Sequence, residues 1–132
     1  MERIKERIAV ARQAWKTLNS LLKRRRSKIV RDAGIQRFEY TLEAVWKAGQ
    51  EYLSEMERIQ AASPTSVIRA SNSTGILNRT QTRTCLKMAL DRNLSVHTYN
   101  EDLANQMFAR LPRYATVMDQ WLRALQLRIE PK

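Results

Sequence analysis

The sequence is poor in the residues that build covalent cross-links and metal sites. Its 132 residues include one cysteine, Cys85, and one histidine, His97. One cysteine excludes an internal disulfide framework and a cysteine-rich zinc site, and one histidine disfavours a histidine-built metal site within one subunit. The chain also lacks an apolar run of roughly 18 residues, and its charged N-terminus does not have the apolar core of a secretory signal. We therefore expect a cytoplasmic protein that contacts no membrane and uses no metal or cofactor.

Positive charge dominates what is present. Lysine and arginine total 24 against 13 acidic residues, giving a net charge of +11. Arginine provides 17 of these cations, and its planar guanidinium suits bidentate contact with phosphate. This composition favours a nucleic acid or nucleotide as ligand. A merely basic protein, or one with an acidic protein partner, is the alternative.

Apolar residues recur almost everywhere at helical spacing. Steps of three and four residues mark one stripe in residues 2–22 and a longer one in residues 28–58. A third stripe follows Asn100 and contains Pro112, which predicts a kink. Only three glycines and three prolines interrupt the chain. We predict an all-α fold, an antiparallel up-and-down four-helix bundle with one additional short helix, forming a single domain over residues 1–132.

Polar residues mark the expected helix boundaries. Ser27, Ser63, Asn78 and Asn100 each precede a helical stretch and are suited to accept a hydrogen bond as N-caps. Pro64 fits the first position of a short helix ending near residue 70, and residues 71–78 are expected to form a polar loop. The helix after Asn78 is expected to present one apolar face made of Leu86, Leu90 and Leu94. Gly34 and Gly49, inside the second helix, permit a close approach of helices, for example between subunits.

Two segments concentrate polar side chains. Residues 31–47 place acids and cations at helical spacing, which also fits an ordinary solvated helix face with weak ion pairs. Residues 91–100, DRNLSVHTYN, gather Arg92, Asn93, His97 and Tyr99. Arg92 and His97 are five residues apart, so they share a site only if the arginine reaches around the helix or the helix breaks before His97. A lone histidine near a helix end is more often structural than catalytic.

Together, two blocks carry a family resemblance. IVRDAGIQRFEYTLEAVWKAGQEYL (residues 29–53) and DRNLSVHTYNEDLANQMFARLP (residues 91–112) resemble the HEPN superfamily, and within it the nucleotidyltransferase substrate-binding proteins, or HepT-like toxins. The likeness spans about residues 28–125. It implies a helical bundle that forms a homodimer and binds a minimal nucleotidyltransferase as its partner.

The resemblance also implies roles for individual residues. The signature R-x4-H-x-Y matches Arg92, His97 and Tyr99, where the arginine and histidine of toxin members form a metal-independent ribonuclease site. In related pairs the nucleotidyltransferase antitoxin adenylylates the tyrosine and silences the toxin. Other members are described only as nucleotide-binding or substrate-binding subunits, and this non-catalytic role is the alternative function here.

Elementary chemistry is consistent with the toxin role. RNA cleavage without metal needs a base for the 2′-OH proton, an acid for the 5′-oxygen and a cation for the phosphorane. His97 suits proton transfer near neutral pH, Arg92 supplies the charge, and a two-fold dimer would provide a second histidine. Further interpretations concern RNA contact: the basic run 23–31 is a candidate backbone track, and the candidate substrate-binding or orienting residues are Asn93, Asp32, Arg37 and Glu39.

Overall fold

A computed structural model describes residues 1–131, and within that range the chain is helical with no β-strand. This confirms the predicted all-α fold with a short additional helix. The helices in chain order are α1 (Glu2–Leu22), α2 (Lys28–Met56), α3 (Pro64–Ser73), α4 (Arg79–Leu94), the 3-10 helix η1 (Ser95–His97) and α5 (Glu101–Ile129).

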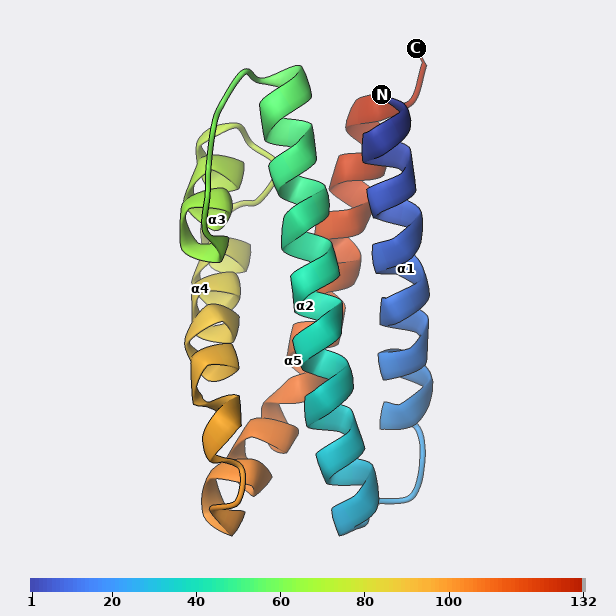
Figure 1. Ribbon diagram of the computed structural model, residues 1–132, viewed down its shortest axis with the longest axis vertical. Coiled ribbons are helices and arrows are strands. Elements are labelled where there is room, and N and C mark those ends of the chain that lie inside the picture. The colour runs from blue at the N-terminus through green and yellow to red at the C-terminus, as the bar shows by residue number, and fades with distance from the viewer. Residues whose placement is uncertain (132) are drawn as a thin grey trace.

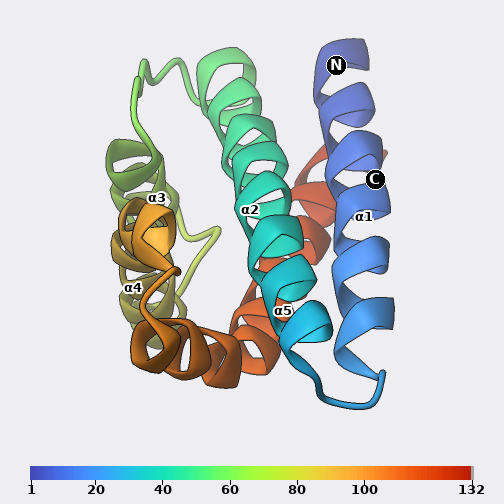
Figure 2. The same ribbon diagram turned by 60° about the horizontal axis from the view of Figure 1, so that its bottom comes forward.

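The long helices run up and down the molecule. α1 descends from the N-terminus, α2 returns, α4 descends and α5 rises again to end beside the start of α1 (Figure 1). α1, α2 and α5 pack against one another. α3 packs against α2, and α4 packs against both α3 and α5. Figure 2 shows α3 and α4 on one side of α2 and α1 on the other. None of the helices in residues 1–131 is long and apolar enough to cross a membrane.

The predicted N-caps are present. The side chains of Ser27, Ser63, Asn78 and Asn100 each accept a hydrogen bond from a backbone N–H in the first turn of the following helix. Pro112 lies inside α5, and Figure 1 shows this helix changing direction between its orange first part and its red second part. The missing N–H and the ring of proline account for the bend.

The loop after α3 is shorter and less polar than expected. α3 continues to Ser73, and the hydroxyls of Ser73 and Thr74 donate to the carbonyls of Arg69 and Ala70 in its last turn. Ile76 and Leu77, within the predicted polar loop, are buried against the core at 5% and 1% exposure. Gly75, which precedes them, has φ +81°, a left-handed conformation that glycine adopts without steric cost.

The glycines of α2 provide close packing within one chain. A Cβ at Gly34 would stand 2.9 Å from the Phe108 ring, and one at Gly49 would stand 3.1 Å from Trp121. Both neighbours belong to α5. The close approach that the sequence permitted is therefore between α2 and α5 of the same subunit.

The α4 helix turns a different face inward from the one its leucines indicated. Its buried residues are Thr82, Cys85, Met88, Ala89 and Asp91. Leu90 and Leu94 are 60% and 41% exposed, and Leu86 is only partly buried. The leucine row therefore lies along the outside of the subunit, where nothing in residues 1–131 covers it fully.

Candidate functional site

Arg92, His97 and Tyr99 lie around the junction between α4 and α5. The α-helix ends at Leu94, and η1 turns the chain through Ser95–His97 before α5 begins. The hydroxyl of Ser95 donates to the carbonyl of Arg92 at 2.7 Å, which stabilises this change of winding. Of the two geometries left open by the sequence, the structure shows the helix breaking before His97.

His97 and Tyr99 are both exposed, and their side chains contact each other. The Nδ1 atom of His97 is 3.3 Å from the Tyr99 hydroxyl, and their rings meet edge to face at 80°. Tyr99 is 82% exposed. The imidazole is therefore open to an external ligand on a surface segment, with a phenol as its immediate neighbour.

Arg92 is held by an acid of α2. Its Nη2 atom donates to Oε2 of Glu43 at 2.8 Å, and Trp46 and Lys47 approach the same carboxylate at 3.1 and 3.2 Å. Partial burial raises the pKa of Glu43, but the hydrogen bonds from Trp46 and Lys47 and the charge of Arg92 outweigh it and lower the pKa below its ordinary value. Arg92 therefore sits beside a permanent anion at neutral pH.

A buried carboxylate anchors the residue before Arg92. Asp91 is fully buried and accepts two hydrogen bonds from Arg110, at 2.7 and 2.9 Å, and one from the Tyr114 hydroxyl. Burial and the Asp91 carboxylate raise the pKa of Tyr114, and the hydrogen bond to Asp91 raises the pKa of Arg110. This bidentate contact ties the last turn of α4 to α5.

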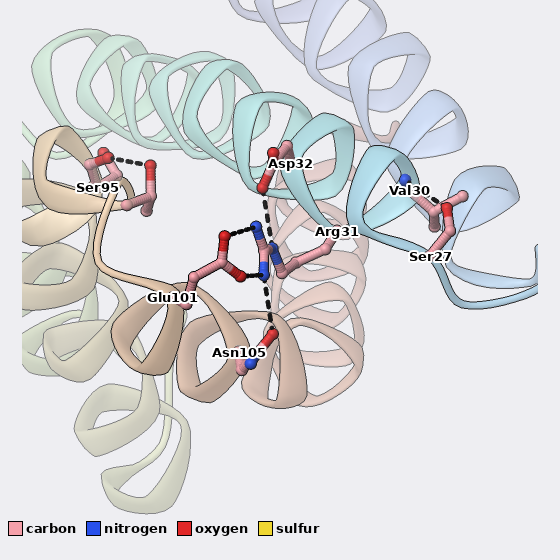
Figure 3. A network of polar contacts seen from close by, with 8 residues as sticks. Ser27, Val30, Arg31, Asp32, Ser95, Glu101 and Asn105 are labelled. Carbon is pink, nitrogen blue, oxygen red and sulfur yellow. Dashed lines mark hydrogen bonds and ion pairs between the residues drawn. The ribbon is translucent and has the colours of Figure 1, made fainter.

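A second polar network anchors the other side of the junction (Figure 3). Arg31 of α2, only 4% exposed, donates to the carboxylate of Glu101 in the first turn of α5. It also donates to Asp32 at 2.9 Å and Asn105 at 3.1 Å. The hydrogen bond from Arg31 lowers the pKa of Glu101. The segment from Arg92 to Tyr99 is thus fixed at both ends.

The other predicted site residues do not all lie at the α4–α5 junction. Asp32 belongs to the Arg31 network, and Glu39 lies one helical turn before Glu43. Asn93 is exposed on α4 beside Arg92. Arg37, in contrast, donates to the Thr17 carbonyl of α1 at 2.8 Å, so the structure holds it against α1, away from the α4 junction.

The metal-ligating side chains are dispersed, and the single thiol is buried. Residues 1–131 contain no group of three or more His, Cys, Asp or Glu side chains placed to hold a metal ion. Burial raises the pKa of Cys85 to about 12, so this thiol remains protonated and unreactive near neutral pH.

Comparison with known proteins now assigns the chain. Residues 6–127 match the family model described as nucleotidyltransferase substrate binding protein like. The chain belongs to this family. This confirms the resemblance of the two sequence blocks. No curated protein matches the chain.

Two solved structures place this family member among its relatives. A crystal structure of a protein from Thermus thermophilus is 50% identical, covering 87% of this chain and 98% of that one, with a TM-score of 0.85. A crystal structure of a mutant MntA-HpeT toxin-antitoxin is 14% identical, covering 96% of this chain and 99% of that one, with a TM-score of 0.76. At that low identity the second likeness concerns the fold alone.

Sequence reasoning on this nucleotidyltransferase substrate-binding-like chain missed its two anchors. Asp91, Arg110 and Tyr114 were not singled out, and Arg31 was treated only as part of a polar helix and of the basic run 23–31. The available signal was the spacing of Arg110 and Tyr114, which are four residues apart and share one face of α5. That face had no apparent acidic partner until the fold brought α4 to it.

Proposed function

We propose that the protein is a HepT-like toxin, a metal-independent ribonuclease acting on cytoplasmic RNA and neutralised by a nucleotidyltransferase partner. The observation that supports this most directly is the geometry of the α4–α5 junction. His97 is open to solvent, Arg92 is half-buried five residues before it, and both belong to a segment fixed at either end. Such fixation is what catalysis by positioned groups requires.

The proposed cleavage uses the RNA's own 2′-OH as nucleophile. One imidazole removes the 2′-OH proton, the oxygen attacks phosphorus, and the bond to the 5′-oxygen breaks as that oxygen gains a proton. The products are a 2′,3′-cyclic phosphate and a 5′-hydroxyl. Arg92 would contact the phosphorane, exchanging the Glu43 carboxylate for the phosphate oxygens.

A homodimer would supply the second proton-transfer group. One His97 is poorly suited to act as acid and base in one concerted step, whereas a two-fold axis near this junction would bring a second His97 to the same RNA. The exposed leucine row supports such a contact, since Leu90 and Leu94 lie on the same helix as Arg92 and Val96 is 73% exposed in η1. Exposed aliphatic side chains that lie together are suited to a contact between proteins.

Tyr99 is the proposed point of neutralisation. Its hydroxyl is exposed and 3.3 Å from His97. A nucleotidyltransferase partner holding ATP would join the Tyr99 oxygen to the α-phosphorus, releasing pyrophosphate and the phenolic proton. The attached AMP would place negative charge and bulk where the RNA phosphate binds, and so block cleavage.

The second candidate is a non-catalytic subunit that presents nucleotide or substrate to the nucleotidyltransferase. Two observations favour it: the matching family is described by substrate binding, and the charge of Arg92 is already paired with Glu43. This function predicts nucleotide binding and a stable complex with the partner, without intrinsic cleavage of RNA.

An assay of RNA cleavage in EDTA distinguishes the two functions. Purified wild type, His97→Ala and the control Gln126→Ala are compared on transfer RNA and total RNA; both substituted side chains are exposed. We expect cleavage by wild type and the control, and loss of at least about a hundredfold in His97→Ala, the lower range for removal of a general acid or base. Equal cleavage by all three proteins would contradict this site. No cleavage by any of them, with retained nucleotide binding, would favour the subunit function.

A further inference from the structure

A groove between α4 and α5 is left unexplained by the candidate site. It consists of two adjoining open hollows of about 480 and 540 Å³ that share Thr84 and Arg113 in their walls. The two helices that form it pack against each other, as Figure 2 shows at the lower left. On α5 the wall extends from Ala109 to Gln120, about 16 Å at the rise of an α-helix.

The cations of the groove gather in its first hollow, and the second hollow is lined mainly by uncharged polar side chains. Arg83, Lys87 and Arg113 line the groove and make no ion pair within residues 1–131. No Asp or Glu lines either hollow. Asp91, which is bonded to the wall residues Arg110 and Tyr114, is fully buried, and its charge is paired with Arg110. Three uncompensated cations around a concave surface attract a polyanion.

We propose that this groove binds the sugar–phosphate backbone of an RNA strand. Arginine and lysine recognise phosphate oxygens, and the threonine and glutamine side chains that line the second hollow can donate to further phosphates of the same strand. Its lining offers no surface on which a base could stack, because its one aromatic residue, Tyr114, is 1% exposed and its hydroxyl is bonded to Asp91. Binding through phosphates without base contacts is independent of sequence.

The groove also has a structural connection to the candidate site. Arg110 and Tyr114 form part of its wall and hold Asp91, the residue next to Arg92. RNA lying along α4 would therefore approach the end of the helix that carries Arg92 and leads into η1. The choice of RNA as ligand rests on the proposed ribonuclease function, but the phosphate-binding chemistry of the groove does not.

Binding of an uncleavable RNA tests the groove separately from catalysis. A fluorescent 2′-O-methyl strand of about 12 nucleotides lacks the 2′-OH nucleophile, and its affinity for the full chain is measured by anisotropy over a salt series. The groove variant is Arg83→Gln/Lys87→Gln/Arg113→Gln. The control, Arg3→Gln/Lys5→Gln/Lys16→Gln, removes the same charge from α1.

The groove variant should bind roughly tenfold or more weakly near 0.1 M salt, and its log–log salt slope should be shallower by about 2, since each single-strand phosphate contact contributes about 0.7. The control should retain most of its affinity. Equal RNA affinity of the two variants would overturn the proposal. So would a groove variant that binds RNA as wild type does but no longer binds ATP, measured as a second ligand, because the groove would then be a nucleotide site. Circular dichroism checks folding, and the single reversal Lys87→Glu should weaken RNA binding in the same direction.

The outcome is distinguishable from that of the cleavage assay. Weakened RNA binding in the groove variant, with no cleavage by wild type, would support the groove and contradict the ribonuclease. Cleavage by wild type, with unchanged RNA binding in the groove variant, would support the ribonuclease and contradict the groove.

Discussion

Glu43 shows how one side chain sets the state of the candidate site. It faces the end of α4 and gathers three donors, from Arg92, Trp46 and Lys47. Their combined effect lowers the pKa of Glu43 although its partial burial opposes the shift. An anion stabilised in this way holds the Arg92 guanidinium in one orientation. At this scale function depends on which of several similar acids the fold brings to the arginine.

The contribution of Glu43 to stability should depend on pH in a defined direction. A carboxylate whose pKa is lowered in the folded state stabilises the protein above its ordinary pKa, here 4.5, and loses that effect as pH falls through the lower folded value. We expect Glu43→Gln to reduce the free energy of unfolding at neutral pH, and the difference from wild type to shrink below pH 4.5. Urea denaturation at several pH values measures it.

Glu39→Gln, one turn earlier on α2, is the matched control because Glu39 has no ion-pair partner within residues 1–131. It should change the free energy of unfolding at neutral pH by less than Glu43→Gln does. A Glu43→Gln penalty that grows as the solution is acidified would contradict the assignment.

At the scale of the helices, buried polar contacts hold the junction in place. α4 contributes a mixed inner face rather than a continuous apolar one, and Asp91 is the charged residue on it. Its two oxygens accept all three hydrogen bonds from Arg110 and Tyr114. A buried carboxylate with these hydrogen bonds fixes the register of α4 on α5. It thereby also fixes the position along the helix axis at which Arg92 contacts Glu43.

Removing Asp91 should be strongly destabilising. Asp91→Ala would leave the Tyr114 hydroxyl and the Arg110 guanidinium without their partner, and loss of one member of a buried pair costs about 3–5 kcal/mol. We expect a loss near the lower end, because Arg110 is 30% exposed and regains some water. Urea unfolding measures the change. Asp102→Ala, at an exposed position of α5, should lie within about 0.5 kcal/mol of wild type; similar losses in both variants would refute the anchor.

At the scale of the molecule, α4 separates three kinds of surface. Its inner face packs on the core, its border with α5 forms the cationic groove, and its outer face carries Leu90 and Leu94. A protein of charge +11 repels its own copies, so self-association requires a compensating apolar contact. The proposed dimer would use the outer leucines, on the side of α4 away from the Arg92 side chain, for such a contact.

A charge placed on this outer face should disrupt the proposed dimer. We expect wild type to sediment as a dimer and Leu90→Glu as a monomer, because a glutamate would be buried unpaired in the interface. Leu127→Glu is the matched control, since Leu127 is 70% exposed near the end of α5; it should remain dimeric. A wild type that sediments as a monomer, or a Leu90→Glu variant that stays dimeric, would contradict an interface on this face.

The sequence alone was sufficient for the helices, because helical periodicity and N-caps depend on residues three or four positions apart. Ser27, Ser63, Asn78 and Asn100 cap the helices as predicted, and the two sequence blocks identified the family. The tertiary structure alone decided which helix faces meet. It turned Leu90 outward, placed Arg37 against α1, and paired Arg92 with Glu43, 49 residues away. Local pattern cannot specify such choices, since the inward face of a helix depends on burial and partners contributed by distant segments.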